Sequence, residues 1–406
     1  MAEGRGKMQM NELYRGGLVL LLGFIFLKIG GVLFRLISMS MLPVGAYGEV
    51  AVFLVLFNWF TLFATFNITI GLAKFVSSSG GQAKRHYTAA LLGAVLLSLA
   101  VSAILFAIAP VLADLINVGI GVVYWAIAAL PFAAVYNVGI FYFRGTYRMR
   151  LSTLADAGMM TVRIVLLSGL LIAGVYYAPF LSFVASFIAI DIYILLKNRK
   201  DMSYDRSRSA QDFRKLLIYS FPIFIGEFLR SFAFSLDRIV LSGFYSSTQA
   251  GFYDVAAALC LGYVVIASSY SNALLPKASA SRERRKELFR ALKASSVLFA
   301  LYSVLLAVLG KPLVHAINPL YDGVFTFIYP LAGSYMITGF LMLMFFFANS
   351  TGRQKYAAYA GGVFAFLSLV LNLYLVPSML YMGAVYALGA SALAALMVIG
   401  VLLWRS

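Results

Sequence analysis

The chain has 406 residues, of which 62% are hydrophobic and only 12% are charged, and its formal net charge is +17. Because a soluble domain carries about 25% charged residues, this composition excludes an ordinary soluble domain and indicates a polytopic membrane protein. The apolar runs continue for 20 or more residues without the alternation typical of barrel strands, so the spans are predicted to be helices.

A basic N-terminal segment is followed by twelve apolar stretches, each long enough for one membrane-spanning helix. The uncharged stretch from Tyr356 to Trp404 is too long for one helix and is divided near Pro377–Ser378. The predicted spans are residues 16–40, 47–73, 88–112, 120–143, 152–175, 179–197, 215–243, 251–275, 289–310, 324–348, 356–376 and 381–404.

The basic residues sort to one side of these spans. Of the 32 Lys and Arg residues, 26 lie in the N-terminal segment, in the alternate loops on its side and at the C-terminus; only Lys311 lies in the opposite loops. Because cytoplasmic loops carry the excess of Lys and Arg, we predict a multi-pass protein of the cell membrane with both termini in the cytoplasm. The loops then face anionic membrane lipids, which explains the net charge without nucleic acid as a partner.

An internal repeat appears when the sequence is shifted by 203 residues. Arg35 then falls on Arg238, Gly48 on Gly251, and Lys74 on Lys277, with no gap over more than fifty residues. Six spans in each half give both halves the same orientation, which is a parallel repeat. We therefore predict an all-α fold with two six-helix bundles around a central cavity. The bundles are residues 1–196 and 216–406, joined by a basic cytoplasmic linker, residues 197–215.

Several charged residues fall inside the predicted spans, where an unpartnered charge costs at least about 2.5–3.5 kcal/mol. At a rise of about 1.5 Å per residue along each helix, these charged residues fall into two sets at different depths in the membrane. The midplane set, predicted to bind substrate, is Lys28, Arg163, Glu227 and Arg230. The outer set, predicted to form a gate or pairs between the bundles, is Arg35, Glu49, Asp237, Arg238 and Asp254.

Purely structural pairing is the alternative for these charges. Glu227 and Arg230 are three residues apart and can pair on one helix face. Asp156 and Arg163, seven apart, share a face. The neighbours Asp237 and Arg238 are expected to point apart and to need different partners.

Catalytic and metal-binding motifs are not found. The single cysteine, Cys260, lies in an apolar run, and His86 and His315 are expected on the solvated surface in loops. There is no phosphate-binding loop of the type used for ATP hydrolysis. We expect no cofactor, no metal and no enzymatic activity.

Two hairpins carry a resemblance to a known family. The segments LLLGFIFLKIGGVLFRLISMSMLPVGAYGEVAV and SFPIFIGEFLRSFAFSLDRIVLSGFYSSTQAGFYDVAAAL resemble the Wzx-like polysaccharide-export flippases of the multidrug/oligosaccharidyl-lipid/polysaccharide (MOP) superfamily. The family pattern of an Asp-Arg pair, a turn and Gly-x-Tyr-x-x-Ala is matched by Asp237, Arg238, Gly251, Tyr253 and Ala256.

The resemblance implies a monomeric flippase that moves a lipid-linked oligosaccharide, a sugar chain on a polyprenyl phosphate or pyrophosphate, by alternating access, with H⁺ or Na⁺ as a possible coupling ion. The alternative is a cation-coupled multidrug antiporter of the same superfamily. That class needs acidic residues in the N-terminal bundle, whereas the mid-depth polar residues of the first two spans are Lys28, Asn58 and Asn67. A glycan polymerase or ligase would need large outer loops, and here they are short.

Overall fold

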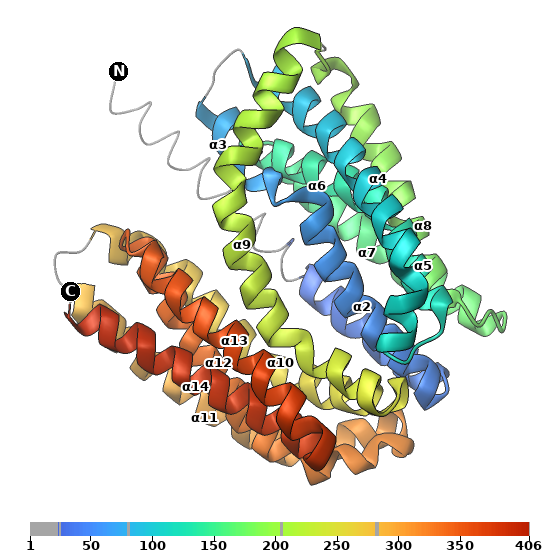
Figure 1. Cartoon of the computed structure of the whole chain (residues 1–406), viewed down its shortest axis with the longest axis vertical. Coiled ribbons are helices and arrows are strands. Elements are labelled where there is room, and N and C mark those ends of the chain that lie inside the picture. Colours follow the sequence, from blue (N-terminus) through green and yellow to red (C-terminus); the bar gives the residue numbers. More distant parts are fainter. Residues whose placement is uncertain (1–22, 24–25, 79–81, 204–205, 281–283, 406) are drawn as a thin grey trace. The chain divides into compact units, whose positions relative to one another are not determined.

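The computed structural model describes residues 23, 26–78, 82–203, 206–280 and 284–405, and within these residues the chain is helical and contains no strand (Figure 1). Residues 26–41 form the described part of the first helix. The helices after it are α2 (Val44–Thr65), α3 (Ile68–Ser78), α4 (Ala83–Leu115), α5 (Ile120–Ala128), α6 (Leu130–Gly145), α7 (Met149–Ile172), α8 (Ala178–Asn198), η2 (Arg199–Asp201), α9 (Arg206–Phe244), α10 (Ser247–Ala280), α11 (Arg284–Ile317), η3 (Pro319–Thr326), α12 (Ile328–Ser350), α13 (Gln354–Met379) and α14 (Tyr381–Arg405).

The predicted all-α membrane fold is confirmed. In the described part of the chain, 11 helical segments are long and apolar enough to cross a membrane. They correspond to the second to twelfth predicted spans. The first predicted span, 16–40, lies partly outside the described residues. The predicted division near Pro377–Ser378 is also found, because α13 ends at Met379 and Leu380 adopts a left-handed conformation with φ of 50°.

Apolar side chains cover the outer faces of the helices. On α4, Leu96 and Val111 are each 68% exposed and Ile104 is 64% exposed. In water, such a helix would be an aggregation site, but lipid tails solvate these side chains as well as a protein core does. The helical hydrogen bonds of α4 satisfy most of its backbone groups, as the hydrocarbon region requires, although Pro110 lacks a backbone donor.

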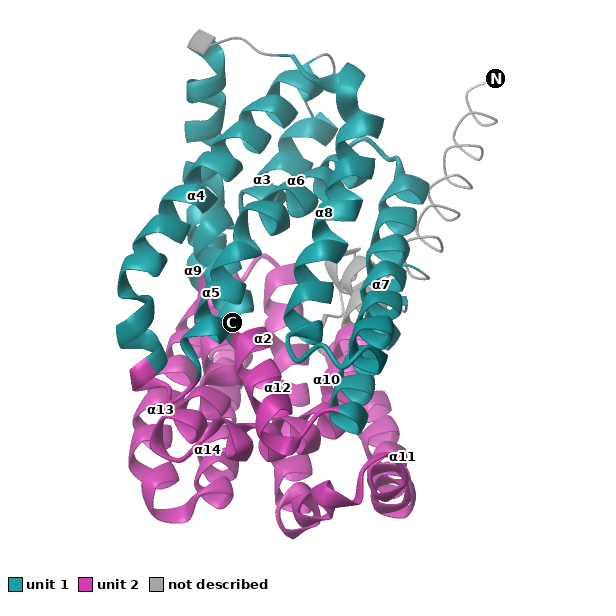
Figure 2. Ribbon diagram, turned by 90° about the vertical axis from the view of Figure 1, so that its right-hand side faces the viewer, with its two compact units in different colours: residues 1–41, 56–113, 119–225 teal, residues 42–55, 114–118, 226–406 magenta. Residues whose placement is uncertain are grey.

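The chain divides into two compact units (Figure 2). Unit 1 is residues 1–41, 56–113 and 119–225, and within it α7 packs on α8, and α6 packs on α3 and α8. Unit 2 is residues 42–55, 114–118 and 226–406, and within it α10 packs on α12, and α14 packs on α12 and α13. Two long helices contribute to both units: α2 divides after Val55, and α9 divides after Ile225.

The segment predicted as a basic linker is largely ordered helix and lies in unit 1. Residues 206–215 form the beginning of α9, and Asp201 and Asp212 anchor the segment. Asp201 accepts a hydrogen bond of 2.6 Å from Arg148, and Asp212 pairs with Arg85. His86 is only 6% exposed, with its Nδ1 3.6 Å from Asp212, so the prediction of a solvated loop histidine was wrong.

The second predicted span, 47–73, is not one continuous helix. Phe66 (φ 42°) and Asn67 (φ 56°) separate α2 from α3. Left-handed backbone is uncommon outside glycine, and asparagine is one of the residues that tolerate it best. At membrane depth, such a break is tolerated where it is buried in protein or lines a cavity, and the apolar pattern gave no sign of it.

Glycines at equivalent positions of the repeat contact each other within unit 2. A Cβ on Gly251 would lie 2.9 Å from the Cα of Gly48, and a Cβ on Gly48 would lie 1.9 Å from the carbonyl oxygen of Ser247. In the same way, the Gly251 Cβ position lies 3.3 Å from the carbonyl oxygen of Val44. Val44 and Ser247 are themselves 203 residues apart, so the contact has the reciprocity of a two-fold axis.

This contact makes Gly48 far more sensitive to substitution than a glycine in open space. We expect Gly48→Ala to lower the thermal unfolding temperature of the detergent-solubilised protein sharply, because the new methyl group collides with backbone, which cannot move aside. Gly31→Ala is the matched control, since none of the described residues lies within 4 Å of its Cβ position. Equal unfolding temperatures for the two variants would show that the α2–α10 contact is not as close as described.

Candidate substrate cavity

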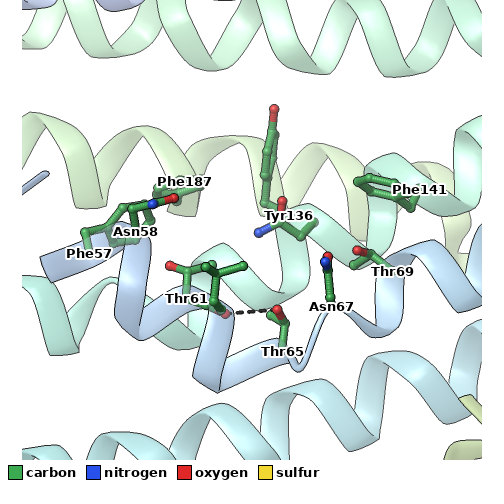
Figure 3. A pocket seen from close by; sticks show the side chains of 11 residues that line it. Phe57, Asn58, Thr61, Thr65, Asn67, Thr69, Tyr136, Phe141 and Phe187 are labelled. Atoms are coloured by element: carbon green, nitrogen blue, oxygen red, sulfur yellow. Dashed lines mark hydrogen bonds between the residues drawn. The ribbon is translucent and has the colours of Figure 1, made fainter. Parts of the chain in front are cut away.

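Unit 1 contains a cavity of about 280 Å³ beside the break between α2 and α3 (Figure 3). Side chains from α2, α3, α6 and α8 and from the break itself line it. The polar lining residues are Asn58, Thr61, Thr65, Asn67, Thr69 and Asn137. The remaining lining residues are Phe57, Leu62, Tyr136, Phe141 and Phe187.

The cavity lining is polar but uncharged. Its hydrogen-bonding groups are three amides, three threonine hydroxyls and the phenol of Tyr136, and within the described part of the chain no Lys, Arg, His, Asp or Glu belongs to it. The Thr65 hydroxyl donates a 2.9 Å hydrogen bond to the carbonyl oxygen of Thr61 (Figure 3). The Thr61 Oγ1 atom is buried and has no hydrogen-bond partner among the described residues. The arrangement suits a neutral ligand rich in hydroxyl or amide groups.

Aromatic rings form one wall of the cavity. The rings of Phe57 and Phe187 lie 5.7 Å apart, and those of Tyr136 and Phe187 lie 5.3 Å apart. Behind them, Phe183 contacts Phe57 edge to face at 4.7 Å. Such pairs have defined relative orientations, which fixes the shape of the wall.

Arg163, from the predicted midplane set, lies behind this wall and is not a lining residue. It is 5% exposed, its Nε donates a 3.0 Å hydrogen bond to Ser186, and its guanidinium carbon lies 3.7 Å from the Phe183 ring centroid. A cation is attracted to the face of an aromatic ring, more so when desolvated. The Nη2 atom has no hydrogen-bond partner among the described residues.

The structural alternative of a pair between Asp156 and Arg163 is not found. The two residues share a face of α7, but Asp156 accepts a 3.0 Å hydrogen bond from Arg144 and another from the hydroxyl of Tyr136. Both donors come from α6. The side chains of a neighbouring helix thus outcompete the partner seven residues away, and Arg163 turns to α8.

Unit 2 contains a buried charge cluster, which we define as Asp237, Arg238, Asp254, Tyr47 and Tyr335. Arg238 donates from Nε to Asp254 at 2.8 Å, from Nη1 to Asp237 at 3.2 Å, and from Nη2 to the Tyr335 hydroxyl at 3.3 Å. Tyr47 donates a 2.9 Å hydrogen bond to the second oxygen of Asp254. All five side chains are at most 5% exposed.

The expectation that Asp237 and Arg238 need different partners is wrong in part. Neighbouring residues on a helix diverge, but the Arg238 side chain is long enough to return to Asp237 while also reaching Asp254. The structure thereby joins three residues of the predicted outer set: Asp237, Arg238 and Asp254.

The other predicted residues are neither members of the buried charge cluster as defined above nor lining residues of the cavity. Lys28, which is exposed, and Arg35, which is half-buried, belong to the first helix. Glu49 is half-buried on α2. Glu227 and Arg230 form an ion pair on α9 with about a third of each side chain exposed.

Asp191 on α8 was missed by sequence reasoning. It is 5% exposed, and neither carboxylate oxygen has a hydrogen-bond partner among the described residues. The available signal was a lone acidic residue inside the predicted span 179–197. No group of three or more potential metal ligands occurs in the part of the chain that the structure describes.

Comparison with known proteins identifies the family of the chain and the fold that it shares. A family model described as "Polysaccharide biosynthesis protein" matches residues 13–281. The chain therefore belongs to the polysaccharide biosynthesis protein family. No curated protein sequence matches the chain.

Solved structures share the fold at low sequence identity. The lipid II flippase MurJ in an inward closed conformation has a TM-score of 0.79 and 14% identity, with 96% of this chain and 88% of that one covered. A multidrug resistance MATE family transporter of the MOP superfamily, in its inward-facing conformation, has a TM-score of 0.73 and 13% identity, with 95% and 97% covered. The eukaryotic MATE transporter AtDTX14 has a TM-score of 0.66 and 14% identity, with 97% of each chain covered. The predicted MOP superfamily fold is confirmed.

The buried charge cluster should matter far more for stability than the exposed pair on α9. We expect Arg238→Gln to destabilise the protein by about 3–5 kcal/mol, because it leaves buried carboxylates without their cation. Glu227→Gln, in a half-exposed pair, should cost about 0–1 kcal/mol. Thermal unfolding in detergent compares the two, and similar unfolding temperatures would contradict the cluster's role.

Asp191 and Asp156 should respond in opposite directions to the same substitution. Asp191→Leu should stabilise the protein by about 1–3 kcal/mol, because it removes a buried polar group that has no partner. Asp156→Leu should destabilise it, since Arg144 and Tyr136 lose their acceptor. The measurement is again thermal unfolding, and a lower unfolding temperature for Asp191→Leu would show that Asp191 has a stabilising partner.

Proposed function

We propose that the chain is a flippase that moves a lipid-linked oligosaccharide from the inner to the outer leaflet of the cell membrane by alternating access, for polysaccharide export. Its substrate is a sugar chain on a polyprenyl phosphate or pyrophosphate, and H⁺ or Na⁺ is the possible coupling ion. It acts as a monomeric transporter and not as an enzyme, with both termini in the cytoplasm. The sorting of basic residues supports this orientation.

The uncharged lining of the unit 1 cavity carries this proposal. A cation-coupled antiporter of organic cations needs a carboxylate that holds positive charge, and no carboxylate belongs to this lining among the described residues. Amides and hydroxyls beside aromatic rings fit a glycan, and membership of the polysaccharide biosynthesis protein family supports the same substrate class.

The midplane set and the outer set keep their proposed roles in this mechanism. Lys28, Arg163 and Arg230 would compensate the phosphate charge as it crosses the membrane, and an arginine can hold a phosphate through two parallel hydrogen bonds. The half-exposed Glu227–Arg230 pair could exchange its carboxylate for that phosphate at small cost. The outer set would act as a gate through the buried pairs of Arg238, with Arg35 as its equivalent in the repeat.

Disrupting the gene tests the function. Cells without the protein should accumulate lipid-linked oligosaccharide in the inner leaflet and lose surface polysaccharide, and expression of the chain should restore both. Arg230→Ala should fail to restore export although it reaches the membrane, and Arg230→Lys should restore part of it, because lysine cannot bind phosphate bidentately.

Arg290→Ala is the matched control, because Arg290 is an exposed residue that also pairs with a glutamate three positions away. Unchanged surface polysaccharide in the disrupted cells, together with greater sensitivity to organic cations, would favour the drug antiporter instead.

A further inference from the structure

We propose that the unit 1 cavity is a subsite for a single neutral sugar ring of the oligosaccharide head group; this inference rests on the proposed function. Four observations within unit 1 support it: the aromatic wall, the polar groups of the lining, the broken helix and the size of the cavity.

The aromatic wall offers a flat apolar surface. One face of a pyranose ring presents C–H groups, which pack against the negative face of an aromatic ring. Phe57 and Phe187 line the cavity and are held in place by Phe183, so the wall is formed before the ligand arrives. A rigid wall reduces the ordering cost of binding.

The polar groups can satisfy hydroxyl and acetamido substituents. An asparagine amide both donates and accepts, and three of them line the cavity. The Thr61 hydroxyl is buried without a partner in the described part of the chain, and a buried polar group without a partner is costly. A sugar hydroxyl would remove that cost, whereas an apolar drug would not.

The broken helix places backbone and side chain at the cavity together. The left-handed Asn67 is both a residue of the break and a lining residue. Discontinuous helices form the substrate sites of many transporters, because their interrupted backbone leaves polar groups available at membrane depth. A break that served packing alone would not need an amide directed at a polar cavity (Figure 3).

Size and charge define the ligand. The volume of about 280 Å³ is just below the range of about 300–1,000 Å³ typical of small-molecule sites, which suits one sugar ring and not a chain. No cation of the described residues lines the cavity, so the carboxylate of a uronic acid would lose its hydration without gaining an ion pair from them. The subsite therefore selects neutral hexoses or N-acetylhexosamines.

The test uses purified full-length protein in proteoliposomes and three synthetic polyprenyl-pyrophosphate lipids, with hexose, N-acetylhexosamine or hexuronic acid as the sugar. Transfer is followed as accessibility of the sugar to a membrane-impermeant oxidant that cleaves vicinal diols. The protein should move the two neutral lipids at least about tenfold faster than the acidic lipid, the ratio expected for one lost buried interaction.

Variants connect this preference to the cavity. Thr61→Val and Asn137→Leu should each slow transfer of the neutral lipids by about threefold to tenfold and leave the slow transfer of the acidic lipid unchanged. Thr161→Val is the matched control, because the Thr161 hydroxyl is exposed on α7 and bonds to the carbonyl oxygen of Ala157 in its own helix. A photoreactive neutral sugar on the same lipid should crosslink to residues 57–69 and 136–141.

The outcomes separate the two proposals. Equal transfer of all three lipids, or cavity variants that behave like Thr161→Val, would overturn the sugar subsite and leave the flippase function intact. No transfer of any of the three lipids would overturn the proposed function, and the sugar subsite with it.

Discussion

The ion pairs of Arg238 with Asp237 and Asp254 are completely enclosed by protein, and much of unit 2 follows from them. A buried guanidinium must be matched by acceptors on nearly every side, and here α9, α10 and α12 each supply one. Tyr47 adds a fourth helix by donating to Asp254, which draws residues 42–55 of the N-terminal half into unit 2. The chain is therefore divided by contacts rather than by sequence halves.

Unit 1 meets the same requirement in a different way. Asp156 is neutralised by Arg144, and Arg163 is accommodated by Ser186 and the face of Phe183. These charges are used inside the helix packing, and the space beside the α2–α3 break is left with amides, hydroxyls and aromatic rings. A neutral cavity next to paired charges can accept hydroxyl groups without competing for ions.

The long helices α2 and α9 connect unit 1 with unit 2. Each has residues in both units, and α9 passes from one to the other four residues after Pro222, where the helix lacks a backbone hydrogen-bond donor. Within unit 2, Gly48 of α2 packs closely against the backbone of α10, and this contact joins equivalent positions of the sequence repeat. Helices that belong to two units are suited to transmit a change in one unit to the other, which the proposed alternating access would require.

The sequence alone determined the helical membrane fold, the positions of eleven spans and the repeat at 203 residues. These properties depend on composition, on continuous apolar length and on scarce charges, all of which are local or periodic along the chain. Tertiary structure alone decided which groups contact Arg163 and Arg238, whether His86 is buried, where the second span breaks and that a neutral cavity lies beside the break. Each of these depends on which side chains of other helices are nearby. In lipid, where a buried polar group has no water to replace a missing partner, those neighbours decide whether a charge is paired, turned aside or, like Asp191, left without a partner among the described residues.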